Sequence, residues 1–320
     1  MTIKKFRRFF SLAIICLVAV VTGVAVGKIF VDQNVPAAVV TGTAADYKDS
    51  DASILALVAK ADGGESVESF SAVELFEIAE YKLSKQNHYR IMTGDVDTNT
   101  FGIVVNQYQQ TERLFRDGVS VVNKLSPSDG GVAPDVCAQT ICNTNTGKIK
   151  INLKGSFENK DKRRIELLKA KFQESDFVYY TEEEYTKEFS CSSSELLPYV
   201  ISSLTCGQGT YDKSPKKNSD GTYSFEIKMS GDHLAAAGIY YSKEINYSAG
   251  VATFVGWDSL VMNVTIDKNF NFLSISYLEK YLMKHNTTGA KPVVTNNFVD
   301  KFFYGEDVPT LEEVLNGSSY

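Results

Sequence analysis

The spacing of apolar and polar residues changes along the chain from a helical period to a strand period. Ser71 to Glu74 has the form of a helix capping box, and apolar residues follow at helical spacing from Phe76 to Leu83. This pattern predicts an amphipathic helix over residues 71–86. The preceding residues 32–69 are rich in small residues and show no sustained period, which indicates a flexible spacer.

After this helix the apolar period becomes two, which is typical of strands with one buried face. Asp117-Gly118 and Ser219 to Gly221 are tight-turn signals that join such runs as hairpins. The predicted strands start at Tyr89 and continue over 103–115, 119–122, 149–153, 177–180, 223–229, 260–266 and 272–282, with an edge strand over 293–303.

Helices are few and do not alternate one for one with the strands. Residues 181–184 cap a short helix, and two further helices are predicted over Ser194 to Thr205 and His233 to Ile245. Residues 126–146 have no period and are predicted to form a long irregular loop. Hairpin-joined strands with few helices exclude a doubly wound parallel sheet. They predict an α+β fold, in which a curved antiparallel sheet forms an unclosed half-barrel with helices on its concave face.

The first 31 residues have the composition of a membrane anchor. Nineteen residues from Phe9 to Gly27 contain no charge, which is enough for a helix across a hydrocarbon core. Four basic residues precede this run, so the positive-inside rule leaves residues 1–8 in the cytoplasm and carries the remainder outside. We expect a single-pass transmembrane anchor in the cell membrane over residues 9–31 and an extracytoplasmic α+β domain over residues 70–320.

A cleaved signal peptide is the alternative, since Gly23-Val24-Ala25 fits a small-x-small cleavage site. Cleavage would leave a secreted protein instead of a tethered one. Cys16 resembles the lipidated cysteine of bacterial lipoproteins, but Ile15 before it is not small, which argues against lipidation. The anchor and the signal peptide both export the body of the chain.

Charge divides the chain at the end of this leader. Five of the 33 basic residues lie in the leader, so the body carries 28 basic and 39 acidic residues, a net charge of -11. A body this acidic repels nucleic acid, which excludes a nucleic-acid-binding protein, and it repels anionic lipid surfaces. The proportions of hydrophobic (43%) and charged (22%) residues are ordinary for a folded chain and exclude wholesale disorder.

The order of these elements resembles that of the lipoprotein-carrier superfamily, which includes LolA, LppX and RseB-type folds and related exported proteins of Gram-positive bacteria. The resemblance covers residues 70–305. It rests on the helix at 71–86, the meander with RLFRDGVSVV at 113–122, the Ala-rich helix at 233–245 and the strand pair SLVMNVTIDKNFNFLSISYLEKY at 259–281. It implies an unclosed β-barrel whose helix-covered concavity holds acyl chains or a lipidated segment of a partner. The anchor is a departure from this family, because a tethered protein cannot shuttle between membranes.

The body contains an even number of cysteines, Cys137, Cys142, Cys191 and Cys206, in a compartment that permits disulfides. Their spacings lack a C-x2-C knuckle and no histidine lies near either pair, which argues against a zinc site. We therefore predict two disulfides, with the pairing left open. The ends of an intact helix lie too far apart for a bridge from Cys191 to Cys206. Such a bridge requires either a break in the predicted helix, for instance at Pro198, or a loop at Cys191 that folds back.

No catalytic signature is present in the sequence. There is no G-x-S-x-G nucleophile motif, and Gly207-Gln208-Gly209 lacks the third glycine of a dinucleotide fingerprint. Asp95 to Asn99 copies the opening of a calcium loop, but Thr100 and Asn106 stand where glycine and glutamate are required. We therefore expect no enzyme activity, no cofactor and no metal site.

Aromatic residues are the remaining candidates for a binding site. Those on elements that face one another across a curved sheet form either an ordinary core or the lining of a cavity for an apolar or acyl ligand. The candidate cavity-lining residues are Tyr179, Phe225, Tyr240, Tyr241 and Tyr277.

These observations predict a membrane-tethered, extracytoplasmic, non-enzymatic binding protein that contacts the membrane through its N-terminal helix. Its ligand is expected to be a lipid, a lipoprotein or a lipidated envelope component. The alternative is a structural or signalling ectodomain that contacts a membrane-protein partner through its face or through residues 126–146.

Overall fold

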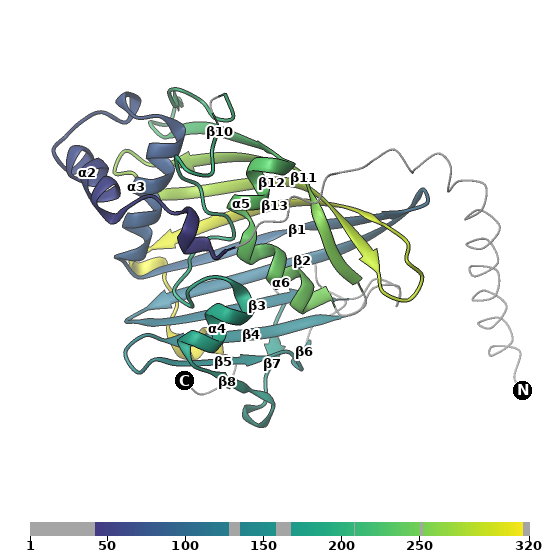
Figure 1. The fold of residues 1–320 in the computed structure, drawn as a ribbon. Helices are drawn as coiled ribbons and strands as arrows, with labels where there is room; N and C mark the ends of the chain where they lie inside the picture. The colour runs from purple at the N-terminus through teal and green to yellow at the C-terminus, as the bar shows by residue number, and fades with distance from the viewer. Residues whose placement is uncertain (1–41, 128–134, 158–167, 208, 250–251, 316–320) are drawn as a thin grey trace, which may run out of the picture. The chain divides into compact units, whose positions relative to one another are not determined.

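The predicted strands join into one long sheet that curves around several helices (Figure 1). The computed structural model describes residues 42–127, 135–157, 168–207, 209–249 and 252–315, which belong to one unit, residues 37–320. Within these residues the sheet has eleven strands, adjacent strands run antiparallel, and its two edge strands do not pair with each other. In spatial order the strands are β8 (Val178–Tyr180), β5 (Lys148–Asn152), β4 (Val136–Asn143), β3 (Val119–Ser126), β2 (Ile103–Arg116), β1 (His88–Thr100), β13 (Val293–Tyr304), β12 (Phe272–His285), β11 (Ala252–Ile266), β10 (Tyr223–Ser230) and β9 (Lys216–Lys217).

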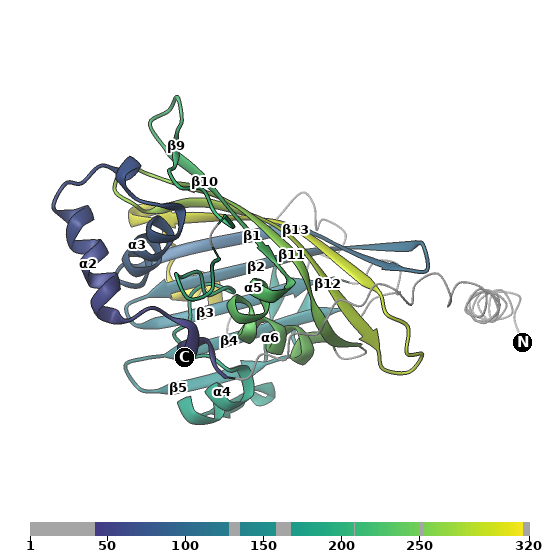
Figure 2. The same ribbon diagram turned by 45° about the horizontal axis from the view of Figure 1, so that its top comes forward.

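The helices lie mainly on one side of the sheet (Figure 2). They are α2 (Asp51–Asp62), α3 (Ala72–Ser84), α4 (Glu182–Phe189), α5 (Gly231–Ala237), α6 (Ile239–Ala249) and α7 (Leu311–Leu315), with short 3-10 segments η1 (Ala44–Tyr47), η2 (Val67–Ser69), η4 (Glu174–Asp176) and η5 (Gly305–Asp307). Helices α5 and α6 pack against β11 in the hollow of the sheet, and α3 packs against β10 and β12. A separate two-stranded sheet pairs β6 (Ser156–Phe157) with β7 (Ala170–Lys171). The α+β class and the curved, unclosed antiparallel sheet are confirmed.

Alternate residues of each strand point to opposite sides, so the sheet carries two cores. The hollow side holds the larger core, in which helix α3 meets β10 to β13. Its fully buried side chains include Phe76, Tyr199, Phe272, Tyr277 and Phe298. On the outer side, Leu114, Val121 and Ile141 are covered by residues 168–177 and by α7.

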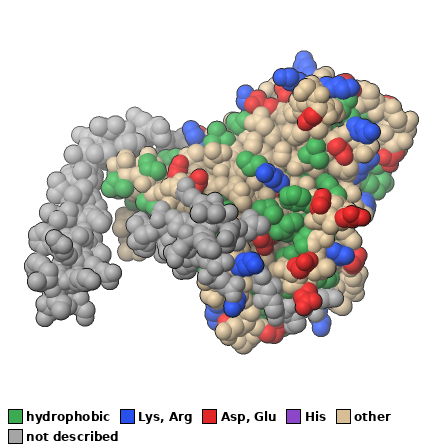
Figure 3. Space-filling view, turned by 180° about the vertical axis from the view of Figure 1, so that it is seen from behind, with side chains coloured by type: hydrophobic (Ala, Val, Ile, Leu, Met, Phe, Trp, Pro, Cys, Tyr) green, Lys and Arg blue, Asp and Glu red, His purple; other side chains and the backbone are tan. Residues whose placement is uncertain are grey.

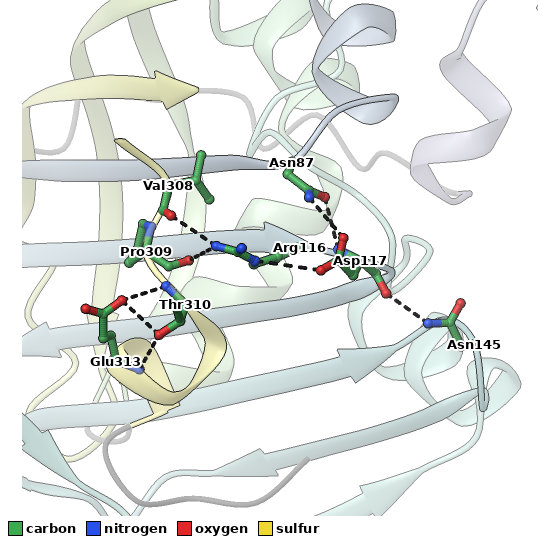
Figure 4. A network of polar contacts seen from close by, with 8 residues as sticks. All are labelled: Asn87, Arg116, Asp117, Asn145, Val308, Pro309, Thr310 and Glu313. Atoms are coloured by element: carbon green, nitrogen blue, oxygen red, sulfur yellow. Dashed lines mark hydrogen bonds and ion pairs between the residues drawn. The ribbon is translucent and has the colours of Figure 1, made fainter. Parts of the chain in front are cut away.

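Polar contacts fix the C-terminal segment to the outer side of the sheet (Figure 4). Arg116 at the end of β2 donates from Nη1 to the carbonyl oxygens of Val308 (3.1 Å) and Pro309 (2.9 Å). Thr310 and Glu313 then cap α7, since the Glu313 carboxylate accepts from the Thr310 amide at 2.7 Å. These bonds hold α7 over the outer core.

Two local predictions are confirmed in detail. Ser71 accepts a hydrogen bond from the Glu74 amide at its side-chain oxygen (3.4 Å), and the Glu74 carboxylate accepts from the Ser71 amide (2.8 Å), as a capping box requires. Asp117 and Gly118 both have positive φ, 52° and 81°, which gives the tight turn between β2 and β3.

The prediction of one irregular loop over residues 126–146 is wrong, because β4 lies within it and pairs with β3 and β5. Gln139 and Thr140 interrupt the apolar pattern of this strand, and Gln139 is nevertheless buried. Its amide donates to the side-chain oxygen of Asn123 at 2.8 Å, so a polar pair satisfies an interior position. Residues 128–134 of the predicted loop lie outside the described residues.

The predicted helix from Ser194 to Thr205 is also absent, and the segment is irregular. Pro198 supplies no amide hydrogen, and the Val200 amide donates instead to the carbonyl of Ala237 at 2.7 Å. The backbone of this segment thus forms hydrogen bonds with a neighbouring segment in place of helical hydrogen bonds.

Two further elements differ from their predictions. The helix predicted over 233–245 is divided into α5 and α6 at Gly238, where a Cβ atom would lie 2.9 Å from the Trp257 ring. The predicted edge strand, β13, is central and pairs with both β1 and β12. The alternating burial along β13 shows that one of its faces is covered by the core and the other is exposed.

Part of the predicted spacer over residues 32–69 is folded. Helix α2 begins after Ser50, whose side chain accepts from the Ser53 amide, and Val58, Ala61 and Val67 are buried against the main core. The predicted anchor over residues 9–31 lies outside the described residues. Among the residues that the structure does describe, no helix combines the length and the apolar character needed to cross a membrane.

Candidate functional site

A cavity of about 70 Å³ lies on the hollow side of the sheet, between strands β2 to β5 and helices α4 and α6. We call it the α4–α6 cavity. Its lining residues are Arg113, Ser120, Val122, Lys124, Ala138, Thr140, Cys142, Ile151, Leu153, Tyr185, Phe189, Cys191, Ser193, Glu195, Tyr240, Glu244, Tyr247 and Ser248.

Aromatic side chains form the helical wall of this cavity. Phe189 packs on Tyr185 and Tyr247 with ring centroids 4.7 and 5.0 Å away. The hydroxyl groups of Tyr180 and Tyr247 lie 3.2 Å apart and link β8 to α6. Helix α4 ends in Ser190, whose φ of 62° turns the chain back toward the cavity. Aromatic residues thus lie on one face of α4, and the chain turns at Ser190 so that the following residues complete this wall of the cavity.

The floor of the α4–α6 cavity carries positive charge. Arg113 of β2 and Lys124 of β3 face it, against the carboxylates of Glu195 and Glu244. Glu195 is already paired with Lys48, which leaves two cations and one carboxylate. Among the described residues, the Arg113 guanidinium has neither a hydrogen-bond acceptor nor an ion-pair partner, and a guanidinium has five N–H donors to satisfy. Such a group is available to bind an anion.

Apolar residues continue from the cavity to the nearest sheet edge. Ile151 of β5 is buried and lies opposite Val178 of β8, so the two side chains share the hollow face. Leu153 directly follows β5 and lines the same cavity. Leu153 is 45% exposed and Val178 is 55% exposed. The edge beside the cavity is therefore an uncovered apolar surface.

All four body cysteines lie in the described residues and are free thiols, which corrects the prediction of two disulfides. Cys137 and Cys142 are five residues apart on β4 and so point to opposite sides of the sheet. Cys137 belongs to the outer core, Cys142 and Cys191 line the α4–α6 cavity, and Cys206 packs against the main core. The even number of cysteines reflects separate burial sites and not bridged pairs.

The two cavity thiols are poor nucleophiles. Burial raises the pKa of Cys142, whose sulfur lies 3.1 Å from the Ser193 hydroxyl, and burial raises the pKa of Cys191 further. A thiol with a raised pKa stays protonated at neutral pH, and only the thiolate reacts readily. Within the described residues, no group of three His, Cys, Asp or Glu side chains is placed to hold a metal ion.

The structure brings together three of the five aromatic residues predicted to line a cavity. Tyr240 lines the α4–α6 cavity, and Tyr241 and Tyr277 line an adjoining space of about 10 Å³ that also touches Arg113 and Lys124. Phe225 is buried in the main core on β10. Tyr179 lies apart on edge strand β8, 60% exposed, and its hydroxyl donates to Glu174 at 2.9 Å.

Sequence reasoning missed the charged and helical parts of the site. Arg113 and Lys124 occupy polar positions in alternating strands, and this pattern predicts that they face solvent. The neighbouring residues in the sequence do not indicate that a helix covers them. Tyr185 and Phe189 lie on α4, of which the sequence predicts only a short capped helix after residues 181–184. The alternation of side chains along β2 is the one sequence signal for this part of the site. It places Arg113 and Thr111 on one side of the strand and Leu114 on the other.

Glu279 lines the same adjoining space as Tyr241 and Tyr277 and is a buried carboxyl group. Its titration should change the free energy of unfolding with pH. Burial raises its pKa from 4.5 to about 7, and its Oε2 accepts from the Asn296 amide at 3.1 Å. The folded protein therefore holds a proton that the unfolded chain releases, and stability should fall as pH rises from 4.5 to 7.

Glu279→Gln keeps the acceptor and removes this titration. We expect the variant to exceed the wild type in free energy of unfolding at pH 8, by about 3 kcal/mol, and to match it near pH 4. Urea unfolding between pH 4 and 8 measures this. If the difference in free energy of unfolding between the two proteins stayed the same from pH 4 to pH 8, the assignment of Glu279 as a buried, protonated carboxyl group would be contradicted.

Comparisons with known proteins give weak likenesses. No family model matches the chain, and no curated protein matches it. Among solved structures, a DUF1329 family protein from Desulfovibrio piger is 10% identical, with 82% of this chain and 98% of that chain covered and a TM-score of 0.23. A putative outer membrane lipoprotein-sorting protein domain from Vibrio parahaemolyticus is 6% identical, with 75% and 94% covered and a TM-score of 0.24. Likenesses with TM-scores this low carry no argument, and the resemblance to the lipoprotein-carrier superfamily stays a prediction.

Proposed function

We propose that the protein is a non-enzymatic binding protein that holds the acidic head of an amphiphile in the α4–α6 cavity. One observation carries this proposal: Arg113 lies without an acceptor in a largely aromatic and aliphatic wall, with Lys124 beside it. Hydrogen bonds between an ionised acceptor and a guanidinium are about twice as strong as neutral ones. A carboxylate or phosphate head satisfies that geometry.

The apolar part of the ligand is accommodated at the sheet edge. Leu153 and Val178 extend the cavity wall outward and are about half exposed, so a hydrocarbon chain laid over them removes apolar surface from water. The same chain would cover the open side of β5 and β8. This is the class of ligand, a lipid or a lipidated group, that the sequence predicts.

Helices α4 and α6 shift outward when this ligand binds. A cavity of about 70 Å³ admits a head group, whereas sites for larger molecules occupy roughly 300–1,000 Å³. The contacts that must yield are the Tyr180–Tyr247 hydroxyl contact and the packing of Phe189 on Tyr247. These lie at the wall and leave the main core intact.

The location of this binding protein is part of the same proposal. The charge-free run from Phe9 to Gly27, behind four basic residues, supports a tether in the membrane with the body outside the cytoplasm. A tethered body with an open apolar edge receives or presents ligands at the membrane to which it is attached.

Displacement of a fluorescent fatty acid from the full chain in mild nonionic detergent tests the function. Palmitate should displace the probe more strongly than hexadecanol, because only palmitate carries the charge that Arg113 and Lys124 recognise. Arg113→Gln and Lys124→Gln should each weaken palmitate binding by about tenfold or more, the usual cost of losing a charged hydrogen bond. Both variants should bind hexadecanol as the wild type does.

Lys228→Gln is the matched control. Lys228 is an exposed lysine on β10 that pairs with Glu226 at 2.7 Å, far along the sheet order from β5. Its loss should leave palmitate binding unchanged. Equal displacement by palmitate and hexadecanol, or palmitate binding that survives both cavity variants, would show that the acidic head is bound elsewhere.

A further inference from the structure

The tip of the β1–β2 hairpin is apolar and exposed. The strands are joined by Phe101 and Gly102, whose φ angles of 55° and 84° form a two-residue turn. Phe101 is 50% exposed, Ile103 63% and Val104 56%. The hairpin extends past the helices in Figure 1, and hydrophobic side chains gather on the projecting end in Figure 3. These side chains rest on nothing within the described residues that removes them from water.

An aromatic residue is an unusual choice for this turn. Both turn positions require positive φ, which favours glycine, asparagine and aspartate and is disfavoured for a residue with a large side chain. Phe101 therefore adopts an unfavourable backbone conformation at the end of the hairpin. A strained residue whose side chain stays half exposed in the folded protein points to a role outside it.

The apolar surface at the tip faces in every direction. Ile103 and Val104 are consecutive in β2, so their side chains point to opposite faces of the hairpin, while Phe101 occupies its end. A folded protein partner covers one face of a hairpin and leaves the other in water. A fluid hydrocarbon phase surrounds the tip and covers all three side chains at once.

The tip also carries nothing that opposes such an environment. Residues 98–111 contain no charged side chain. The Gly102 amide is satisfied within the turn, because it donates to the side-chain oxygen of Asn99 at 3.0 Å. A charge would be costly to transfer out of water, and residues 98–111 present none.

We propose that the β1–β2 tip inserts into the interfacial layer of a lipid bilayer. The depth of insertion is limited by Asp97, the nearest charge, which accepts from Asn106 at 2.9 Å. Phe101 lies four positions after Asp97, a distance of about 13 Å at about 3.3 Å per residue. Interfacial segments bury their apolar side by about 5–10 Å, which fits within that limit. The contact is apolar and not electrostatic, in keeping with the acidic body.

Tryptophan fluorescence in the full chain tests this inference at a single position. The Phe101→Trp variant is reconstituted into phosphatidylcholine vesicles whose acyl chains carry bromine near the head group. We expect its emission to shift to shorter wavelength and to lose most of its added intensity to bromine quenching. Trp257 is buried in the core and gives the same background in every variant.

Leu204→Trp is the matched control, because Leu204 is 61% exposed on the body of the molecule. Its added emission should stay unshifted and unquenched. Ile103→Ser and Val104→Ser, introduced together with Phe101→Trp, should reduce the quenching while leaving the far-ultraviolet circular dichroism unchanged. Equal quenching at positions 101 and 204, or quenching that survives the double serine change, would overturn membrane insertion. This readout is independent of the tether, which is present in every variant.

Discussion

Asp300→Asn should destabilise the fold by about 3–5 kcal/mol, because it leaves the Arg90 guanidinium charged and unpaired in the interior. Arg90 and Asp300 lie on neighbouring strands β1 and β13, and both side chains are at least 98% buried. Nη2 of Arg90 pairs with Oδ2 of Asp300, while Nη1 donates to the Leu196 carbonyl at 2.6 Å. The same guanidinium stacks over the Phe302 ring at 4.7 Å. Urea unfolding of the full chain in mild detergent measures the loss.

Two controls separate the buried charge from the loss of a carboxylate as such. Asp176→Asn removes the partner of Lys154, which is 74% exposed and 3.4 Å away, and should cost less than about 1 kcal/mol. Replacing Arg90 by Met and Asp300 by Leu together should recover most of the loss, because no unpaired charge then remains. A single Asp300→Asn variant as stable as the wild type would contradict the importance of this pair.

Phe76→Ala should cost a similar amount, about 3–5 kcal/mol, through loss of buried apolar surface and creation of a cavity. Phe76 is fully buried on α3, and its ring meets that of Phe272 on β12 with centroids 5.1 Å apart. The buried face of α3, to which Phe76 belongs, packs this helix against the sheet. The same urea unfolding experiment measures the change.

Phe101→Ala is the matched control for that substitution. It removes the same ring from the half-exposed hairpin tip and should change the free energy of unfolding by no more than about 0.5 kcal/mol. A large loss from both variants would mean that the hairpin tip packs against the body. No loss from Phe76→Ala would mean that α3 is not part of the core.

The two predictions differ in how far the sequence could support them. Burial of Phe76 follows from helical spacing after a capping box, so it is visible in residues 71–86 alone. The Arg90–Asp300 pair joins residues 210 positions apart. No feature near either residue indicates the other, because the sequence predicts β13 at an edge and does not predict its pairing with β1.

The candidate site shows the same division. Tyr240, Tyr241 and Tyr277 were predicted from their aromatic character, and they do lie together. Arg113, which carries the proposed function, has in the sequence the pattern of any polar position in an alternating strand. Its role depends on helices α4 and α6, which lie over the hollow side of the sheet and form the other wall of the cavity that Arg113 lines.

The sequence by itself determined the local structure: the period of each strand, the turn at Asp117-Gly118, the capped helix α3, and hence the α+β class. These depend on contacts between residues a few positions apart, which apolar spacing and turn residues record directly. Only the tertiary structure decided that β4 and β13 are interior strands, that Pro198 lies in an irregular segment, and that the cysteines are separate. Those outcomes depend on which distant segments become neighbours, and the same local pattern is compatible with several such arrangements.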